Sequence, residues 1–366
     1  MTKTMLLFFV LLAIDSLGSS FAAAYFTLYD DGLTNVLDTA LVDTAVQIRN
    51  STTLLVTPTA SVLAPAGVTA IDVADSSTLI VQDGATIMGG SYIDNSATKG
   101  GTALRLVARA TAEISGGSFF GGNAISNTTF QKFGGMALLV GSETTTTISG
   151  GLFNGGDADT IGTGGGYARG GNAVLVSVLT TGTFTIKGGS FKGGIGQSSS
   201  ESGKSLVVLG DSTIDIHGGL FFGDWTLQGS NNKFPVVNVY GRDLSLASNN
   251  LYPSPTPNHE LTGYLCDGSR IRVLVRFVLK LNNAYRANLV LNDINPCPPK
   301  ETVAPSIAPS TTASDTHAPS DTHAPSGAPT DSYSSKGTRI QSFWYFKPCV
   351  WLYCCILWAL VVVVVV

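Results

Sequence analysis

Ile148-Ser149-Gly150-Gly151-Leu152-Phe153 is one copy of a phrase, Ile-x-Gly-Gly-x-(Phe/Tyr), that decides the fold of this chain. In each copy an isoleucine precedes a pair of glycines and an aromatic residue follows it. The other copies span residues 87–92, 114–119, 186–191 and 216–221. Self-similarity at a fixed period is typical of stacked supersecondary units, so the chain is expected to be a repeat protein.

A second pattern, an apolar pair at positions i and i+2, precedes most copies. The leading residues of successive pairs lie 31 to 36 positions apart. The alternation is typical of a short strand that turns one face inward, and no helical period appears in the repeats. A β-propeller is the alternative architecture, but its blades need about 40 to 50 residues and four strands each. The pairs are Ile71/Val73, Leu104/Leu106, Leu138/Val140, Val174/Val176, Leu206/Val208 and Val237/Val239.

If the units coil and stack in register, the repeated residues form internal columns. Burial of one Ile or Phe side chain contributes roughly 1.5 to 3 kcal/mol, so two such columns would supply much of the core. The expected isoleucine column is Ile87, Ile114, Ile148, Ile186 and Ile216. The expected aromatic column is Tyr92, Phe119, Phe153, Phe191 and Phe221.

This repeat resembles the right-handed parallel β-helix, or pectin-lyase-like, class of solenoids over roughly residues 43–247. The resemblance implies an all-β, right-handed parallel β-helix of about six coils within an ectodomain of residues 25–300. Residues 25–41 are acidic and weakly patterned, and we expect them to cap the first coil. Residues 261–271 read LTGxLxDGxxI, which is similar to the ending of many secreted β-helix repeat proteins. We expect closing strands there.

Composition and the two ends of the chain indicate where the protein resides. The 366 residues carry a net charge of -4 and only 13% charged residues, so no basic patch for nucleic acid is expected. Residues 1–24 combine a short apolar run with the small-residue ending Phe21-Ala22-Ala23-Ala24, which is typical of a secretory signal peptide. Secretion makes two sequons, at Asn50 and Asn127, candidate N-glycosylation sites.

Cys266 and Cys297 are the two cysteines between the leader and the C-terminal tail. In an oxidising compartment such a pair is expected to form a disulfide, which would stabilise the fold by roughly 3 to 4 kcal/mol in the chain-entropy model. Two free thiols are the alternative.

The C-terminal part of the chain is predicted to be a stalk and an anchor. Residues 301–337 are rich in Pro, Ser, Thr and Ala and cannot bury enough apolar surface to fold, so we expect a disordered stalk. Residues 338–366 end in an apolar run and are expected to be a GPI-type signal with attachment near Ser335. A C-terminal membrane span is the alternative, because the aromatic residues before the run would suit a membrane interface.

Insertions that lengthen the coils suggest where a ligand binds. They recur between the aromatic residue of each copy and the next apolar pair, so they should project from one side of the stack, where repeat proteins often bind partners. Aromatic rings stack on the faces of sugars, and carboxylates accept hydrogen bonds from sugar hydroxyl groups. The candidate ligand-binding residues are Trp225, Tyr167, Asp157, Asp159 and Asp224.

The function predicted from these features is non-enzymatic. The protein would be a cell-surface β-helix that displays loops for glycan binding or adhesion, with an extracellular polysaccharide as partner and the membrane as anchor point. No metal or cofactor is expected. The alternative is an extracellular polysaccharide lyase or glycoside hydrolase of the pectin-lyase-like fold, which needs paired carboxylates or Asp-bound calcium beside a basic residue. Asp157, Asp159, Arg169 and Asp224 are the candidates, but no catalytic residue of those families can be carried over onto this chain.

Overall fold

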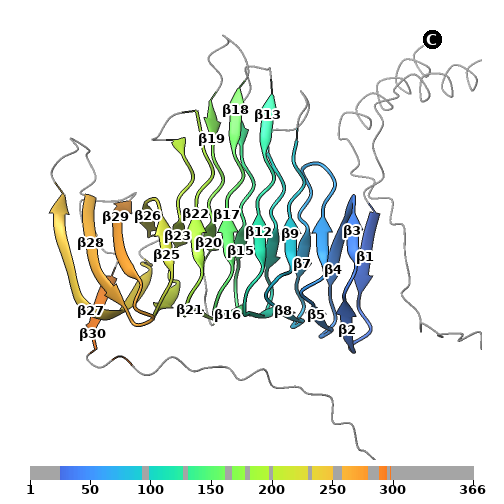
Figure 1. Ribbon diagram of the computed structural model, residues 1–366, viewed down its shortest axis with the longest axis horizontal. Helices are drawn as coiled ribbons and strands as arrows, with labels where there is room; N and C mark the ends of the chain where they lie inside the picture. The colour runs from blue at the N-terminus through green and yellow to red at the C-terminus, as the bar shows by residue number, and fades with distance from the viewer. Residues whose placement is uncertain are drawn as a thin grey trace, which may run out of the picture.

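The computed structural model describes residues 25–92, 99–126, 131–160, 167–177, 182–197, 201–229, 233–249, 258–278, 288–294 and residue 297. Within these residues the chain forms strands and no helix. The strands coil into a parallel β-helix with its long axis horizontal in Figure 1. The all-β, parallel β-helix architecture predicted from the repeats is therefore confirmed.

Three parallel faces enclose the core, and each of seven successive coils in the described residues contributes one strand to each face. Face 1 consists of β1 (Tyr25–Tyr29), β4 (Thr44–Ile48), β7 (Ile71–Val73), β10 (Leu104–Leu106), β15 (Leu138–Val140), β20 (Val174–Ser177), β23 (Leu206–Leu209) and the additional strand β26 (Trp225–Gln228). Face 2 consists of β2 (Thr34–Leu37), β5 (Thr53–Val56), β8 (Thr78–Val81), β11 (Thr111–Ile114), β16 (Thr145–Ile148), β21 (Thr183–Ile186), β24 (Thr213–Ile216) and the additional strand β27 (Val236–Asn249). Face 3 consists of β3 (Ala40–Val42), β6 (Ser61–Leu63), β9 (Thr86–Met88), β12 (Ser118–Phe120), β17 (Leu152–Asn154), β22 (Ser190–Lys192) and β25 (Leu220–Phe222).

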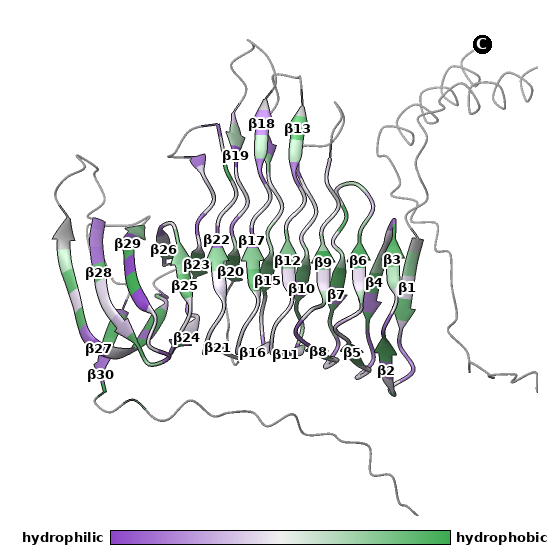
Figure 2. Ribbon diagram, in the orientation of Figure 1, coloured by the Kyte–Doolittle hydropathy of each residue, from purple (hydrophilic) through white to green (hydrophobic). Residues whose placement is uncertain are grey.

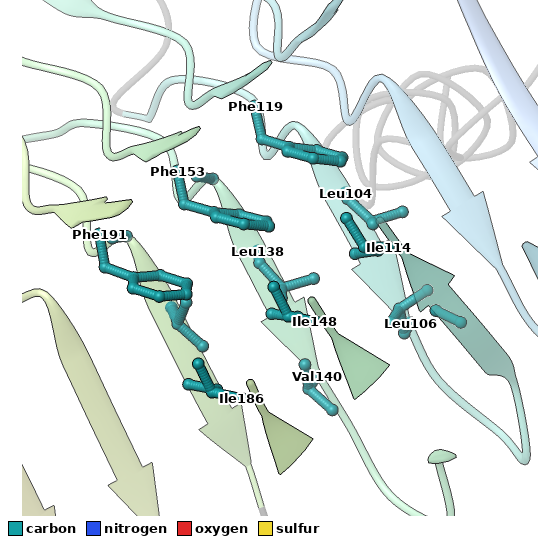
Figure 3. Packing of buried hydrophobic residues seen from close by; sticks show 14 of the residues in the cluster. Leu104, Leu106, Ile114, Phe119, Leu138, Val140, Ile148, Phe153, Ile186 and Phe191 are labelled. Atoms are coloured by element: carbon teal, nitrogen blue, oxygen red, sulfur yellow. The ribbon is translucent and has the colours of Figure 1, made fainter. Parts of the chain in front are cut away.

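The repeated residues form the two expected columns from the second copy onward. On face 2, Ile114 pairs with Ile148 and Ile148 with Ile186. On face 3, Phe119, Phe153 and Phe191 lie in register, and their rings stack with centroids 4.6 and 5.1 Å apart (Figure 3). All of these side chains are buried, and Figure 2 shows hydrophobic residues along the strands of the coils. The core is thus built by stacking like residues on like.

The first copy of the phrase departs from the expected columns. Ile87 pairs with Phe119, so it heads the aromatic column, and Val81 takes the place beside Ile114. Tyr92 pairs with Ala124 beyond the three faces. The reason is that the glycine pair of this copy lies after face 3, whereas the glycine pairs of the later copies form the turn between face 2 and face 3.

Residues 25–41 do not form a separate cap. They make strands β1 and β2 and most of β3, and these pair in parallel with β4, β5 and β6. The register places Thr27, Tyr29 and Asn35 at inward positions that carry Val46, Ile48 and Leu54 in the next coil. The capping role therefore falls to a complete coil with partly polar inward positions. With this first coil, the described residues contain seven coils, whereas about six were expected.

An antiparallel hairpin closes the other end. β28 (Asn258–Leu265) pairs antiparallel with both β27 and β29 (Arg270–Val278), and β30 (Asn288–Asp293) pairs with β27. The predicted disulfide between Cys266 and Cys297 is present, with the two Cα atoms 5.3 Å apart. Next to it, Asp267 Oδ2 accepts a hydrogen bond from the backbone N–H of Gly219, 2.8 Å away, which ties the hairpin turn to the last copy of the phrase. The predicted closing strands are therefore confirmed.

Candidate functional site

Between face 3 and face 1, the chain of the middle coils runs outward and then returns. The outgoing and returning segments of successive coils stack into two close-packed walls, which we call the neck. The outgoing wall leaves face 3 through glycine pairs, and the returning wall leads back to face 1 through others. The outgoing pairs are Gly89-Gly90, Gly121-Gly122, Gly155-Gly156 and Gly193-Gly194, and the returning pairs are Gly100-Gly101, Gly134-Gly135 and Gly170-Gly171. A Cβ atom at Gly121 would overlap the backbone carbonyl of Gly135 in the returning wall, and one at Gly122 would overlap the carbonyl of Gly90 in its own wall. Only glycine permits so close an approach of the two walls.

One zigzag of backbone hydrogen bonds joins the two walls of the neck. Gly122 N–H donates to Gly101 C=O, Gly135 to Gly122, Gly156 to Gly135 and Gly171 to Gly156, each at 2.8 Å. Each bond joins a glycine of one wall to a glycine of the other, so the hydrogen bonds hold the two walls together along the neck. A glycine-rich stretch that reads as a flexible loop in the sequence is therefore a hydrogen-bonded, close-packed element.

Beyond the neck the chain projects as a small two-walled fin, visible at the top of Figure 1. Its outgoing wall pairs β13 (Ala124–Ser126) with β18 (Ala158–Thr160), and its returning wall pairs β14 (Lys132–Phe133) with β19 (Ala168–Arg169). The buried alanines Ala124, Ala158 and Ala168 pack together between the walls. The predicted projection of the insertions from one side of the stack is thus confirmed for these coils.

A shallow groove of about 270 Å³ follows the outer surface where face 3 passes into the outgoing wall. It is the candidate site, because it contains a predicted ligand-binding residue, Asp157, and crosses four coils. Its lining residues are Met88, Ser91, Phe120, Gly121, Asn123, Asn154, Gly155, Asp157, Lys192, Gly193 and Ile195.

A ladder of polar side chains is fixed along one side of the groove. Ser91 Oγ accepts a hydrogen bond from the backbone N–H of Asn123 at 3.1 Å, and Asn123 Oδ1 accepts one from Asp157 N–H at 2.8 Å. Asp157 Oδ1 in turn accepts one from Ile195 N–H at 2.7 Å. Each bond uses one oxygen, so the Ser91 hydroxyl hydrogen, the Asn123 amide N–H groups and Asp157 Oδ2 retain bonding capacity. Side chains pinned in this way are preorganised for a ligand.

The other side of the groove is a column of outward residues on face 3. Met88, Phe120, Asn154 and Lys192 lie in register on successive strands. Met88 is 36% exposed. Asn154 Oδ1 is buried and has no hydrogen-bond partner among the described residues. Along this face 3 side of the groove the side chains therefore change from apolar, at Met88 and Phe120, to amide and ammonium, at Asn154 and Lys192.

The fin separates the acidic candidates from Tyr167 and Arg169. Ala158 and Ala168 point between the walls, so strand alternation directs Asp157 and Asp159 to the outer surface of one wall. It directs Tyr167, which is 42% exposed, and Arg169 to the outer surface of the other. The combination of Asp157, Asp159 and Arg169 considered for catalysis is therefore not brought together.

Trp225 is not a surface residue, and the prediction that it contacts a ligand is wrong. Its side chain is completely buried, and β26 places it in register with Leu206, in the inward column of face 1. Its ring meets Phe221 edge-on at a centroid distance of 5.0 Å. The signal in the sequence was the apolar pair Trp225/Leu227, which begins an eighth strand of face 1.

Asp224 is engaged in a structural ion cluster. Its carboxylate lies 3.2 Å from Lys204 Nζ and 2.9 Å from an Arg276 guanidinium nitrogen. The two cations come from the last returning segment of the neck and from the closing hairpin. We therefore assign Asp224 to the junction of these elements rather than to the groove.

Comparison with known proteins gives no relative. No protein-family model, curated protein or solved structure matches the chain. The site must therefore be interpreted from its own chemistry. In the described residues no three His, Cys, Asp or Glu side chains are grouped closely enough to hold a metal ion. Among the described residues that line the groove, Asp157 is the one carboxylate, so they do not supply the paired carboxylates needed for glycoside hydrolysis.

The remaining predicted sites fall partly outside the described residues. Asn50 is exposed in a tight turn with φ of 58°, where a glycan would extend into solvent. The signal peptide of residues 1–24, the sequon at Asn127, the stalk, Ser335 and the C-terminal tail all lie outside the described ranges. Among the described residues no helix has the length and hydrophobicity to span a bilayer.

His217 belongs to a second polar cluster on the outer side of face 2. Its ring stacks on that of Tyr240 at a centroid distance of 4.1 Å, and Asp215 accepts a hydrogen bond from Asn238 at 2.8 Å. Burial lowers the pKa of His217 and the nearby Lys187 adds to this, while Asp215 opposes it. The stack was not anticipated from the sequence, because Tyr240 lies 23 residues later in the chain.

Proposed function

We propose that this protein is a non-enzymatic, surface-displayed β-helix that binds a linear glycan in the groove between face 3 and the fin. Within this proposal the signal peptide directs secretion, and the stalk and anchor hold the solenoid at the outer face of the cell membrane. The observation that carries the proposal is the ladder of Ser91, Asn123 and Asp157, whose side chains are fixed one coil apart along an open groove.

The chemistry of the groove suits a sugar chain. A pyranose presents hydroxyl groups at its edge and C–H groups on its faces. Asn123 and Asp157 supply amide donors and a carboxylate acceptor for the edge. Phe120 and Met88, in the facing column, supply apolar surface for the face. Sites that bind small ligands combine apolar surface with a few fixed polar groups in the same way.

The groove also runs in the direction that a polymer requires. Equivalent positions repeat from coil to coil about every 4.7 to 4.9 Å, the spacing of neighbouring strands. A linear chain lying along the solenoid axis would therefore meet one side chain from each side of the groove per coil, at regular intervals. A compact ligand would use only one or two of the four coils.

Substitution within the ladder tests the proposal. Asp157→Asn keeps an oxygen for the Ile195 N–H but removes the charge, and hydrogen bonds to charged groups contribute roughly 1.5 to 3 kcal/mol. We expect binding to oligosaccharides, measured by calorimetry after a glycan-array screen, to weaken by about 10-fold to 100-fold. Glu113→Gln on face 2 is the matched control and should bind as the unaltered protein does.

The same material tests the enzymatic alternative. Incubation with acidic polysaccharides would reveal a lyase or hydrolase of the pectin-lyase-like class through new reducing ends or unsaturated products. Turnover that disappears in Asp157→Asn would replace the binding proposal by a catalytic one. Binding without turnover is the expected result.

A further inference from the structure

We propose that the groove continues one coil further, to an apolar subsite at Phe222, and that it is built for a long, neutral, linear glycan. This inference rests on the proposed glycan binding and adds the class and length of the chain. It also identifies Phe222 as the aromatic residue that contacts the sugar, because the side chain of Trp225 is buried.

Phe222 is the next member of the column that lines the groove. Lys192 on β22 pairs with Phe222 on β25, so Met88, Phe120, Asn154, Lys192 and Phe222 follow one another on five strands. Four strand spacings separate the first from the last, which makes the strip about 19 Å long. The preceding residue, Phe221, points inward and stacks on Phe191, so alternation directs Phe222 to the outside.

Large apolar side chains gather at this end of the strip in exposed positions. Phe222 is 53% exposed, Leu220 beside it on β25 is 45% exposed, and Ile195, which lines the groove, is 59% exposed. Leu220 pairs with Ser190, so it lies in the neighbouring outward column of the same face. A cluster of exposed apolar residues next to a polar groove is typical of a binding surface. Its continuity with the groove indicates the same ligand rather than a second one.

The charges of the strip indicate a neutral ligand. Within the part of the chain that the structure describes, the groove lining contains one cation, Lys192, and one anion, Asp157. Apolar rungs, Met88 and Phe120 on one side and Phe222 on the other, flank this balanced pair. A polyuronate would place a carboxylate on each sugar against these apolar rungs and near Asp157, and it would lose the hydration of those charges without gaining a cation for each. A neutral chain meets no such cost.

The test compares chain lengths. The full chain is titrated with neutral cello- and chito-oligosaccharides from the disaccharide to the hexasaccharide, and with oligogalacturonides of the same lengths. We expect affinity for one of the neutral series to rise with length until the strip is covered. In Phe222→Ser the short oligosaccharides should bind as they do to the unaltered protein, whereas the longest should bind about fivefold to tenfold more weakly. Tyr264→Ser, a change at an exposed aromatic residue on β28, is the matched control and should leave both unchanged.

The outcomes separate this inference from the proposed function. Binding that does not depend on length, equal losses for short and long chains in Phe222→Ser, or tighter binding of the oligogalacturonides would overturn the inference and leave glycan binding in place. Failure of the unaltered protein to bind any glycan would overturn both. An unchanged melting temperature of Phe222→Ser shows that an altered affinity comes from the lost contact.

Discussion

Single residues of the repeat carry the stability of the solenoid, and Phe153 illustrates how. Its ring lies between those of Phe119 and Phe191, parallel to the first and 13° from the second, with the side chain fully buried. The stacked arrangement follows from the parallel register, which places identical residues directly above one another. Removing one ring therefore leaves a cavity that its neighbours cannot fill, because their backbones are fixed by the strands on both sides.

We predict that Phe153→Ala lowers the free energy of unfolding by about 3 to 5 kcal/mol, the usual cost of a buried Phe-to-Ala change. Denaturant unfolding followed by circular dichroism measures the loss. Phe222→Ala, an exposed phenylalanine on the same face, is the control and should change stability by about 0.5 kcal/mol or less. Equal effects of the two substitutions would contradict the assignment of inward and outward positions.

His217 makes stability depend on pH. Its pKa is lowered from the usual value near 6.5 in the folded state, so the unfolded chain binds its proton more readily. Stability that is present above about pH 6.5 is therefore lost as the pH falls through the lower, folded pKa. We predict that the melting temperature drops less between pH 7.5 and about pH 5 in His217→Gln than in the unaltered protein. Parallel pH profiles of the two proteins would show that His217 does not contribute.

At this scale the sequence predicted the inward positions of the regular copies well and the position of Trp225 poorly. Phe119, Phe153 and Phe191 repeat with the glycine pairs, so their burial follows from periodicity. Trp225 was harder, because it lies after the last copy of the phrase, in a segment that lacks the regular spacing. The pairing of Trp225 with Leu206 establishes that Trp225 points inward, whereas the outward position of Phe222 follows by alternation from the inward Phe221.

The neck is the element that the sequence did not reveal. Isolated glycine pairs such as Gly121-Gly122 and Gly134-Gly135 look like loop punctuation, because glycine usually marks turns. Their structural role is visible only in the stacked coils, because each outgoing glycine pair contacts the returning glycine pairs of neighbouring coils. The turn glycines of the repeat differ from them. Gly117 and Gly151 have φ near 92° and 104°, a region that favours glycine, so their conservation from copy to copy was easier to interpret.

We predict that Gly122→Ala destabilises the protein by about 1 to 3 kcal/mol or more, because the new Cβ atom would overlap the Gly90 carbonyl of the preceding coil and press on Gly101 of the opposite wall. Gly268→Ala, in the hairpin turn, is the comparison. No atom lies within 4 Å of the Cβ position there, so its cost comes from the positive φ of 86° alone, about 1 to 2 kcal/mol. Gly122→Ala should also weaken glycan binding, because the adjacent Asn123 belongs to the polar ladder. A Gly122→Ala protein with unaltered stability and binding would show that the walls are not close-packed.

For the whole molecule, the two ends of the solenoid are finished differently. The first coil has partly polar inward positions and carries Asp30, Asp31, Asp38 and Asp43 at or next to its turns. Acidic residues at a terminal coil disfavour the addition of further strands. The last coils are covered by the hairpin of β28 and β29 and fastened by Cys266 and Cys297. The architecture could be predicted from the repeated phrase, and the closing strands could be predicted from the LTGxLxDGxxI ending. The groove could not be predicted, because it depends on where the neck lies relative to face 3.

The chain leaves the described solenoid at Cys297, at the end opposite the first coil, so an anchor beyond the stalk would hold the solenoid by its disulfide-bonded end. We predict that the anchor is a GPI group attached near Ser335 and that residues 338–366 are removed, because small residues at Ser334-Ser335, a spacer and then an apolar run follow one another in the order of a GPI signal. Phosphatidylinositol-specific phospholipase C should then release the protein from intact cells, and mass spectrometry should find no peptide from the Val-rich tail. Recovery of that tail in the mature protein, together with resistance to the phospholipase, would instead establish a C-terminal membrane span.

Cleavage near Ala24 is the companion expectation, since it would make Tyr25, the first residue of β1, the start of the mature chain.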